Sequence, residues 1–379
     1  MNTIKFTIRV TAQPSSLRAS FTKQSKFWYV FSSLVLIALL VSACQSTVAV
    51  TETPTTAPSL TVSPPTPTEN VYGFSQDAFV TLTSLEKVND YPLYVMHFVG
   101  GYDSPAMAIL PDNTSFACSL FAALGDEDNL LYGRNFDWTS SPALLLYTDP
   151  PDGYASVSMV NLAFLGINSD NVRPLREISL PERAPLLQTP HFPSDGMNEY
   201  GLAIGMAAVD ESVADYDPSR PTIGSLLIIR EVLDHARDVD EVVVLFGEYN
   251  IDFSGGPPIH YLVADSRGQS VLLEYVDGQM AVLPNENTWH LATNHLLAAG
   301  IRTGGNSSWR YDIVGERLAT TSGILTPVDA MDLLKVVSSI YPTQTQWSVV
   351  YDISNGSIDV AMGRNYDAID NFQLKRVYP

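Results

Sequence analysis

Short apolar and alternating runs dominate residues 71–379 and predict a protein built mostly of β-strands. The stretches 115–124 and 129–138 flank Gly-Asp-Glu-Asp, which is typical of a hairpin turn. Residues 258–283 are expected to form three strands, because Ser-Arg-Gly and Asp-Gly interrupt the apolar pattern. Runs of the same character predict further strands at 91–100, 143–149, 154–162, 201–209, 288–294, 346–363 and 372–378.

Helical periodicity, in which apolar residues recur three and four positions apart, appears in four segments. The first is expected to begin at Pro221 and Thr222. The segments are 223–238, 239–249, 307–321 and 326–340. Strands joined by hairpins, with the helices in separate pairs, favour an α+β fold over a parallel doubly wound sheet. No glycine-rich phosphate loop joins a strand to a helix, so nucleotide binding is not predicted.

The first 44 residues have a different pattern. They include five basic residues and no acidic residue, and the apolar run FWYVFSSLVLIALL follows the last of these basic residues. Val-Ser-Ala then precedes Cys44. This order is typical of a secretory signal segment. A cysteine at this point resembles a bacterial lipobox, in which the cysteine is acylated after cleavage. The alternative is an ordinary signal anchor with an incidental cysteine.

Residues 45–70 are dominated by threonine and proline and contain too few apolar side chains to form a core. We expect a semi-rigid stalk there, with the folded part beginning near residue 71. The sequence therefore predicts an extracytoplasmic lipoprotein of the bacterial cell envelope, held to the membrane by a lipid on Cys44.

The formal net charge is −20, from 41 acidic and 21 basic residues. Nucleic-acid binding needs a basic face, so no nucleic-acid partner is expected. The two cysteines, Cys44 and Cys118, exclude a disulfide framework, and no CxxC or Cys/His zinc pattern is present. The sequence predicts no metal and no cofactor, and it does not indicate an oligomeric state.

Cys118 lies in a predicted strand of mostly apolar residues, where a cysteine is commonly a small buried hydrophobe. A papain-like site is an active alternative, but none of the six histidines carries a signature for taking the thiol proton. A third interpretation needs no histidine. Cleavage of the Ala117–Cys118 bond would give Cys118 a free α-amine, whose reference pKa of about 7.7–8.0 suits general-base catalysis.

Two residues of the next predicted strand extend this interpretation. Arg134 would favour the thiolate through its positive charge, and Asp137 would accept a hydrogen bond from the α-ammonium group. Because they are three positions apart, one of them is expected to reach Cys118 from the end of the strand. Distortion of the strand at the Ala117–Cys118 bond would assist cleavage.

Cys118 followed by GRNFDW resembles the choloylglycine hydrolase family of N-terminal-nucleophile amidases. This family includes bile salt hydrolases and penicillin V acylases, with acid ceramidase and the penicillin acyltransferases as relatives. Four more segments resemble family motifs in the same order: 195–207, 260–295, 306–312 and 347–367. The resemblance implies a four-layer αββα sandwich with mostly antiparallel sheets.

The resemblance also implies roles for individual residues. Cys118 would be both nucleophile and base, flanked by Arg134 and Asp137. Asn294 would donate its side-chain amide to the oxyanion, and Arg310 would stabilise the thiolate or the substrate. The alternatives are a turn at a strand end for Asn294 and an exposed position on a helix for Arg310.

Two features depart from the bile salt hydrolase pattern. Ala208 stands where these enzymes usually carry Asn or Tyr, ten residues beyond Asn198, which we interpret as a turn residue. The interval from Asn294 to Arg310 also lacks their long insertion. Both features favour the acyltransferase and ceramidase-like branches, which have a pro-segment ahead of the cysteine, as residues 71–117 would be here.

The predicted organisation is a signal segment (1–44), a stalk (45–70), a pro-segment (71–117) and a catalytic domain (118–379). The preferred function is a self-processing amidase that hydrolyses a linear amide bond of an N-acyl compound. An acyltransferase that uses the same acyl-enzyme and an inactive lipid-anchored binding protein are the alternatives. After cleavage, the pro-segment either stays packed through its predicted strand or releases the catalytic domain from the membrane.

Overall fold

The computed structural model describes residues 72–102, 117–168, 175–210, 212–214, 216–298, 306–341 and 343–377. The predicted signal segment with Cys44, the predicted stalk, and residues 103–116 of the predicted pro-segment lie outside these residues. Among the described helices, none is long and apolar enough to cross a membrane.

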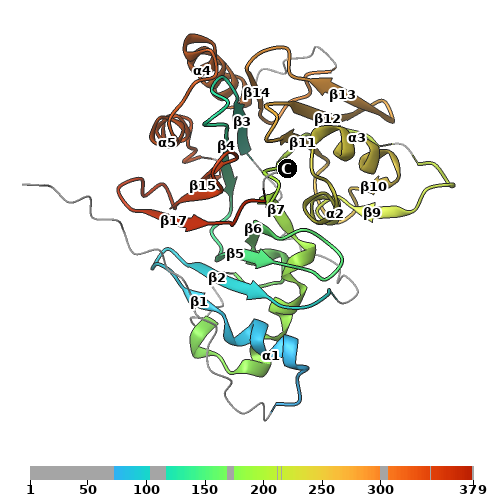
Figure 1. Ribbon diagram of the computed structural model, residues 1–379, viewed down its shortest axis with the longest axis vertical. Coiled ribbons are helices and arrows are strands. Elements are labelled where there is room, and N and C mark those ends of the chain that lie inside the picture. The colour runs from blue at the N-terminus through green and yellow to red at the C-terminus, as the bar shows by residue number, and fades with distance from the viewer. Residues whose placement is uncertain are drawn as a thin grey trace, which may run out of the picture. The chain divides into compact units, whose positions relative to one another are not determined.

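Two mostly antiparallel sheets form the centre of the described part of the chain (Figure 1). The larger sheet contains, in spatial order, β1 (Glu86–Lys87), β2 (Leu93–Phe98), β5 (Ala143–Thr148), β6 (Ser156–Asn161), β7 (Pro193–Asn198), β8 (Ala203–Ala208), β11 (Ile259–Ala264), β12 (Ser270–Val276) and β13 (Gln279–Pro284). The smaller sheet contains β14 (Trp289–Ala292), β3 (Ala117–Ala123), β4 (Leu131–Trp138), β15 (Gln344–Asp352), β16 (Ser357–Met362) and β17 (Ile369–Gln373). A parallel pair, β9 (Thr222–Gly224) with β10 (Asn250–Asp252), forms a separate small sheet.

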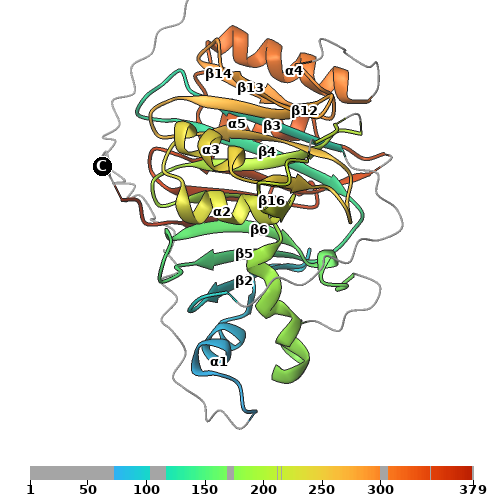
Figure 2. The ribbon, with the colours of Figure 1, turned by 90° about the vertical axis from the view of Figure 1, so that its right-hand side faces the viewer.

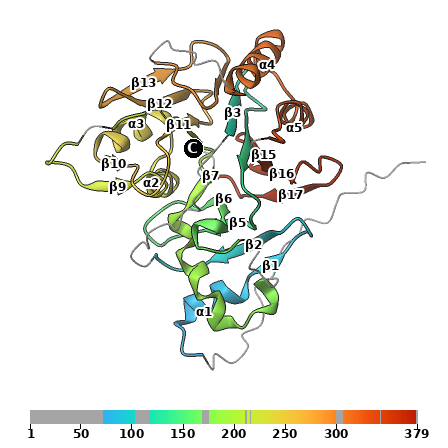
Figure 3. The same ribbon diagram turned by 180° about the vertical axis from the view of Figure 1, so that it is seen from behind.

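Helices cover the outer faces of the two large sheets, which gives four layers (Figure 1), and Figure 2 views these layers from the side of α2 and α3. On the larger sheet, α2 (Leu227–His235) packs on β7 and β8, and Phe246 of α3 (Val239–Gly247) meets Tyr261 of β11 edge-on, with 4.8 Å between ring centroids. On the smaller sheet, α4 (Asn306–Thr321) packs on β3 and β14, and α5 (Pro327–Val336) packs on β4 and β15. Figure 3 shows both helix pairs from behind. The predicted α+β organisation is confirmed.

The other described helices are α1 (Gln76–Thr83) and the 3-10 helices η1 (Leu162–Phe164), η3 (Leu175–Glu177) and η4 (Leu180–His191). At the start of α1, the Ser75 side chain accepts a hydrogen bond from the Ala78 N–H at 3.2 Å. The helix then packs against η4. The apolar pattern predicts neither helix. In η4 the reason is visible, because Pro185 and Pro190 interrupt any α-helical periodicity.

Several predicted boundaries are wrong, including that of the helix expected at 326–340, which ends at Val336. The first predicted helix does not begin at Thr222, because Thr222–Gly224 forms β9 and α2 begins at Leu227. Parallel pairing with β10 buries Ile223, and this pairing with a distant segment outweighs the local helical pattern. At the other end of the chain, the strand expected at 372–378 ends at Gln373.

The hairpin of β3 and β4 is confirmed, in regular register from Ala117 opposite Asp137 to Ala123 opposite Leu131. Every residue of both strands is buried, since β3 and β4 lie between the larger sheet and the helices α4 and α5. A glycine is needed within this hairpin. A Cβ atom at Gly133 would lie 2.3 Å from Cζ of Phe121.

Strand β2 belongs to the predicted pro-segment, yet it is an internal strand of the larger sheet. It pairs with β1 on one side and, in parallel, with β5 on the other side. Its side chains Leu93, Tyr94 and Met96 are at most 2% exposed. The described pro-segment therefore shares both a sheet and a core with the predicted catalytic domain.

Candidate active site

The thiol of Cys118 lies between the two large sheets. Side chains alternate along β3, so Cys118 and Leu120 join the core shared with the larger sheet, whereas Phe121 and Ala123 pack toward α4 and α5. The cysteine forms no disulfide, and its side chain is 0% exposed. In the uncut chain the sulfur is therefore closed off from solvent.

Arg134 is the cation nearest to this sulfur among the described residues. It pairs with Leu120 across the hairpin and so points to the same side of the sheet as Cys118. Its Nη2 lies 3.8 Å from Sγ, and its guanidinium sits over the Phe136 ring at 4.8 Å. The positive charge of a buried guanidinium at this distance lowers the pKa of the thiol, against the effect of burial.

Asp195 holds Arg134 from the opposite sheet. Its Oδ2 accepts a hydrogen bond from Nη1 of Arg134 at 2.5 Å, and both side chains of this ion pair are 0% exposed. Tyr351 donates its hydroxyl to Oδ1, and Trp347 donates Nε1 to Oδ2 at 3.4 Å. The sequence analysis gives Asp195 no role. Its partner lies 61 positions away on another strand, and its place at the start of segment 195–207 was the only signal.

Burial raises the pKa of the Cys118 thiol above its ordinary value. The charge of Arg134 opposes this effect, and the carboxylate of Asp137 adds to it. The buried sulfur is therefore a thiol at neutral pH. It becomes a nucleophile only when a base takes its proton, and Arg134 cannot supply that base.

Asp137 approaches the Ala117–Cys118 bond from the end of β4, where it pairs with Ala117. Thr345 Oγ1 donates to its Oδ1 at 2.5 Å, and Nη1 of Arg310 lies 3.5 Å from its Oδ2. Burial raises the pKa of Asp137 to about 7, against the lowering effects of Arg310 and Thr345. This carboxyl group can hold or release a proton near neutrality.

Arg310, on α4, is not the exposed helix residue that the sequence left as an alternative, because it is 2% exposed. Its Nη1 donates to the carbonyl oxygen of Cys118 and, at 3.1 Å, to Oγ of Ser119. Its Nη2 donates to Oδ1 of Asn294 at 2.9 Å. One guanidinium thus connects the helix, the cysteine strand and Asn294.

Asn294 directly follows Thr293 at the end of β14 and reaches the nitrogen of the Ala117–Cys118 bond. Its Oδ1 accepts a hydrogen bond from the Cys118 N–H at 2.6 Å, and its Nδ2 donates to the carbonyl of Ala208 at 2.9 Å. In the uncut chain, Asn294 is therefore an acceptor at this bond rather than the donor that the sequence predicts. The backbone carbonyl of Ala208 thus holds the Asn294 amide, but as an acceptor it does not replace the Asn or Tyr side chain that is missing at this position.

All five predicted side chains meet around one peptide bond. Four of them, Cys118, Arg134, Asp137 and Asn294, lie in residues 118–295, which match the family described as linear amide C-N hydrolases, choloylglycine hydrolase family. The matched segment is just under half of the chain, and over it the chain resembles this family. The match identifies a hydrolase of carbon–nitrogen bonds in linear amides, and the alternative of an inactive binding protein is not supported.

Two solved structures are similar to this chain. A mutant conjugated bile acid hydrolase from Clostridium perfringens aligns with a TM-score of 0.50 and 16% identity, over 68% of this chain and 92% of that one. A penicillin V acylase from Agrobacterium tumefaciens aligns with a TM-score of 0.45 and 16% identity, over 69% and 94% of the two chains. The first alignment confirms the predicted sandwich of N-terminal-nucleophile hydrolases.

Asn198 is the turn residue that the sequence predicts. Its Oδ1 accepts from the N–H groups of Tyr200 and Leu202 at 3.1 and 3.2 Å. Its Nδ2 donates to the carbonyls of Leu233 and Ala236 at the end of α2. Asn198 thus closes the turn between β7 and β8 and connects this turn to α2.

Glu274, on β12, anchors the loop that follows Asn294, and the sequence analysis did not identify it. Its carboxylate accepts from the N–H groups of Leu297 and Ala298, at 3.0 and 2.8 Å, and contacts Nδ1 of His260 at 2.9 Å. Burial opposes the charge, yet His260 and the two N–H groups leave the pKa of Glu274 below its usual value. A charged carboxylate therefore fixes this loop from the opposite sheet.

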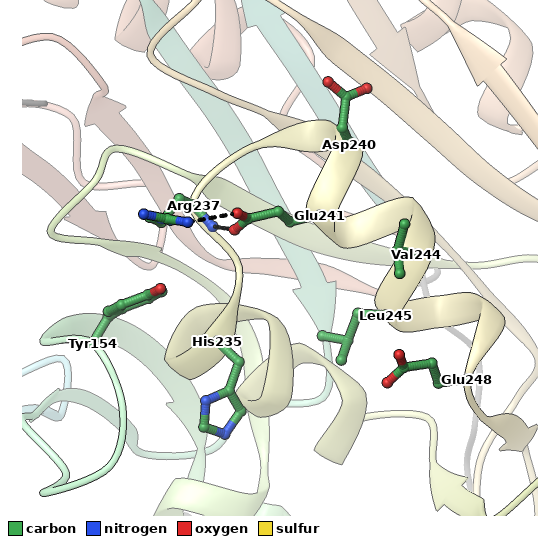
Figure 4. A pocket seen from close by; sticks show the side chains of 8 residues that line it. All are labelled: Tyr154, His235, Arg237, Asp240, Glu241, Val244, Leu245 and Glu248. Carbon is green, nitrogen blue, oxygen red and sulfur yellow. Dashed lines mark hydrogen bonds and ion pairs between the residues drawn. The ribbon is translucent and has the colours of Figure 1, made fainter.

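A surface pocket of about 370 Å³ lies on α3 and the end of α2, and it contains none of these site residues (Figure 4). Four of its eight lining residues are charged, and Arg237 donates to Glu241 at 3.0 Å. Its lining consists of Tyr154, His235, Arg237, Asp240, Glu241, Val244, Leu245 and Glu248. No cysteine, serine or threonine is among these lining residues.

Proposed function

We propose that this amide hydrolase is made by self-cleavage at Ala117–Cys118 and uses the new N-terminal cysteine as both nucleophile and base on an N-acyl amide. One observation carries the proposal. The buried Cys118 has a guanidinium at its sulfur, but no histidine contacts that sulfur in the described part of the chain. The α-amine released at residue 118 supplies the missing base at the sulfur itself.

Self-cleavage begins with addition of Sγ of Cys118 to the carbonyl carbon of Ala117. The carbon–nitrogen bond breaks, and the thiol proton ends on the cysteine nitrogen, which leaves a thioester and a free amine. Water then opens the thioester, giving the carboxylate of Ala117 and restoring the thiol. Asn294 and Arg310, which contact the N–H and C=O of Cys118, support this step by positioning the cysteine.

Strand distortion is not needed in this proposal. The pairing of β3 with β4 is regular through both Ala117 and Cys118, and neither residue has a positive φ. The strand register is thus regular at this bond in the uncut chain. Asp137, whose carboxyl titrates near neutrality beside the bond, is a better candidate for assisting proton movement.

In the proposed catalytic cycle, the α-amine of Cys118 takes the thiol proton and Sγ attacks the substrate carbonyl. The resulting oxyanion accepts a hydrogen bond from Asn294, and Arg134 stabilises the sulfur charge before attack. The α-ammonium group, oriented by Asp137, protonates the leaving amine. Water then releases the acyl group from sulfur.

We propose that the pro-segment stays in place after cleavage. The buried Leu93 and Met96 of β2 each contribute roughly 1.5–3 kcal/mol of burial. In addition, β2 pairs along its whole length with β5. These contacts favour retention over release of the catalytic domain.

Intact mass and N-terminal sequencing of the active protein test this function. We expect one chain that begins at Cys118, and a single uncut, inactive precursor from Cys118→Ala. Cys118→Ser is expected to cut slowly, because a hydroxyl can make the same attack. Activity from a chain with an unbroken Ala117–Cys118 bond would contradict the proposal.

The substrate class is tested by incubation of the processed protein with N-acyl amino acids, N-acyl homoserine lactones, penicillin V and bile salts. Release of a free acid supports hydrolysis. Appearance of a new amide when an amine is added identifies acyl transfer from the same acyl-enzyme. Complete inertness of the processed protein toward all four classes would remove the N-acyl proposal.

We also propose that the protein is a cell-envelope lipoprotein, on the basis of Val-Ser-Ala-Cys44 and the Thr/Pro-rich residues behind it. Cys44→Ala is expected to move the protein out of the membrane fraction or to block removal of the signal segment. Unchanged fractionation and processing would show that Cys44 carries no lipid.

A further inference from the structure

The side-chain amide of Asn294 is held in one orientation by two contacts. Nη2 of Arg310 donates to its Oδ1 at 2.9 Å, and its Nδ2 donates to the carbonyl of Ala208 at 2.9 Å. An amide nitrogen carries two hydrogens, so one of them remains for the oxyanion of the proposed reaction. Since Ala208 brings no side-chain donor of its own, the direction of this second hydrogen matters for the reaction.

The backbone on both sides of Asn294 determines where this amide lies. Before it, β14 pairs with β3 as far as Ala292. After it, the N–H groups of Leu297 and Ala298 donate to the carboxylate of Glu274, at 3.0 and 2.8 Å. Strand pairing thus holds one end of the loop that carries Asn294, and a carboxylate of the other sheet holds its other end.

Glu274 is held in turn by His260. Nδ1 of His260 lies 2.9 Å from Oε1 of Glu274, and both side chains are fully buried. A charged carboxylate only accepts hydrogen bonds, so Nδ1 carries the hydrogen of this contact. Within the described ranges, Nε2 of His260 has no hydrogen-bond partner, so the ring makes its hydrogen bond there to Glu274 alone.

This pair lies on the face of the larger sheet that is turned toward Cys118. A Cβ atom at Gly205 would lie 2.8 Å from Cδ2 of Leu120, so Gly205 and, two positions further, Ala207 face the cysteine strand. His260 pairs with Ala207 and therefore shares this face. The histidine and its carboxylate thus belong to the layer between the sheets in which the thiol lies.

We propose that Glu274 and His260 are positioning residues for Asn294, which fix the loop after it and so orient its amide toward the oxyanion. The inference rests on the proposed function and adds two residues to it. Neither residue touches the reacting atoms. Their effect on the reaction passes through Asn294, and this dependence separates positioning from a purely structural role.

The test is a double-mutant cycle on the processed protein, with the amide that the wild-type protein hydrolyses fastest among the four classes named above. Glu274→Gln keeps the size of the side chain but removes the charge that the two N–H groups face. We expect kcat to fall by about 10–100-fold with little change in KM. In the Asn294→Ala background, the same substitution should change kcat by less than about twofold, because the donor that it positions is gone.

His260 allows a rescue by a conservative variant. The side-chain nitrogen of asparagine can take the place of Nδ1 and donate to Glu274, so His260→Asn should retain most of the kcat. His260→Leu provides no donor and should lower kcat as Glu274→Gln does. Equal kcat values for these two His260 variants would remove His260 from the proposal.

Asp265 is the matched control, because it is also a buried carboxylate that holds backbone N–H groups next to β11. It accepts from the N–H groups of Val239, Arg267 and Gln269, at 3.0, 2.9 and 3.1 Å. Asp265→Asn should lower the free energy of unfolding and leave the kcat of the folded, processed protein unchanged.

The outcomes separate this inference from the proposed amidase. An equal loss of kcat from Glu274→Gln with and without Asn294, or no loss in either case, overturns the positioning role and leaves the amidase intact. If the wild-type protein hydrolyses none of the four classes, the amidase proposal fails, and hydrogen exchange in the uncut Cys118→Ala chain then decides the positioning role. The same measurement decides it if Glu274→Gln is not processed.

That measurement follows the exchange of the backbone N–H groups of residues 293–298. Faster exchange on addition of Glu274→Gln or His260→Leu, but not of Asp265→Asn, supports the inference. Unchanged exchange, or an equal acceleration by Asp265→Asn, overturns it.

Discussion

Two fully buried arginines lie in similar surroundings but differ in what they face. Arg134 pairs with Asp195 at 2.5 Å, and Arg230 pairs with Asp234 at 2.9 Å. Burial opposes the charge of each guanidinium, yet the facing aspartate leaves the pKa of each arginine above its usual value. Arg134 then directs its second nitrogen at the sulfur of Cys118.

Arg230 makes its other contacts with hydroxyl groups and a backbone carbonyl, and its guanidinium lies 5.9 Å from the centroid of the Tyr102 ring. Nη1 donates to the hydroxyls of Thr148 and Ser156, both at 2.8 Å, and Nη2 donates to Ser158 at 3.2 Å. Its Nε donates to the carbonyl of Pro190. This arginine therefore joins α2 to β5, β6 and η4. A buried ion pair alone does not mark a reactive site. The role of each pair depends on what its arginine contacts besides the aspartate.

The largest effect is expected from neutralising the aspartate of each pair. Asp195→Asn leaves the Arg134 charge without its partner and shifts its geometry at the sulfur. We expect kcat/KM to fall by roughly 10²–10⁴, which corresponds to 3–5 kcal/mol. Asp234→Asn should lower the free energy of unfolding by a similar 3–5 kcal/mol but leave the kcat/KM of the folded fraction unchanged.

Amide kinetics, corrected for the processed fraction, and urea denaturation measure the two effects. If Asp195→Asn fails to fold, Tyr351→Phe provides a milder test, because it removes one donor to Asp195 and keeps the ion pair. Equal catalytic losses in the Asp195 and Asp234 variants would abolish the distinction between the two arginines.

The next largest effect is expected from replacing one uncharged residue in each of the two sites. Asn294→Ala removes the proposed oxyanion donor, and we expect kcat to fall by about 10²–10³ with little change in KM. Ser158→Ala, the counterpart at Arg230, should cost only about 1 kcal/mol of stability. Steady-state kinetics on both processed variants decide the matter. Wild-type turnover in Asn294→Ala would leave Asn294 as a structural residue at the end of β14.

The smallest effect is a pH dependence of the folding stability, which tests the protonation of Asp137 beside Cys118. Burial raises the pKa of Asp137 to about 7, although Arg310, Thr345, Arg134 and Arg364 all lower it. The folded protein therefore holds a proton that the unfolded chain loses near pH 4. The stabilising effect of this proton is complete below about pH 4 and is lost as the pH rises to about 7.

Denaturation of the uncut Cys118→Ala chain at pH 5 and pH 8 measures this effect against Cys118→Ala/Asp137→Asn. The difference in unfolding free energy between the two proteins should change by about 1.4 kcal/mol for each pH unit between pH 5 and about pH 7. A difference that stays constant across this range would show that Asp137 remains ionised in the fold.

The local features of the site follow from the sequence because they depend on strand alternation. The Gly-Asp-Glu-Asp turn sets the register of β3 and β4, and this register brings Arg134 and Asp137 to Cys118 from two sides. The resemblance to family motifs added Asn294 and Arg310, which the spacing alone does not connect to the thiol.

The features that the sequence did not predict depend on contacts between distant segments. Asp195 and Glu274 each act from the larger sheet on a residue or loop of the smaller one, and no local pattern reports such a contact. The strand β9 exists only because β10 lies beside it. The hydrogen bond from Nδ2 of Asn294 to Ala208 is likewise set by the spacing between the two sheets.

The parallel pairing of β2 with β5 has a consequence for the lifetime of the protein. If Ala117–Cys118 is cut as proposed, one sheet is shared by two separate chains. Unfolding then becomes dissociation, and refolding becomes a second-order reaction that dilution suppresses. A molecule that opens outside a confined compartment would not recover, so its useful life would be set by the rate of unfolding rather than by an equilibrium.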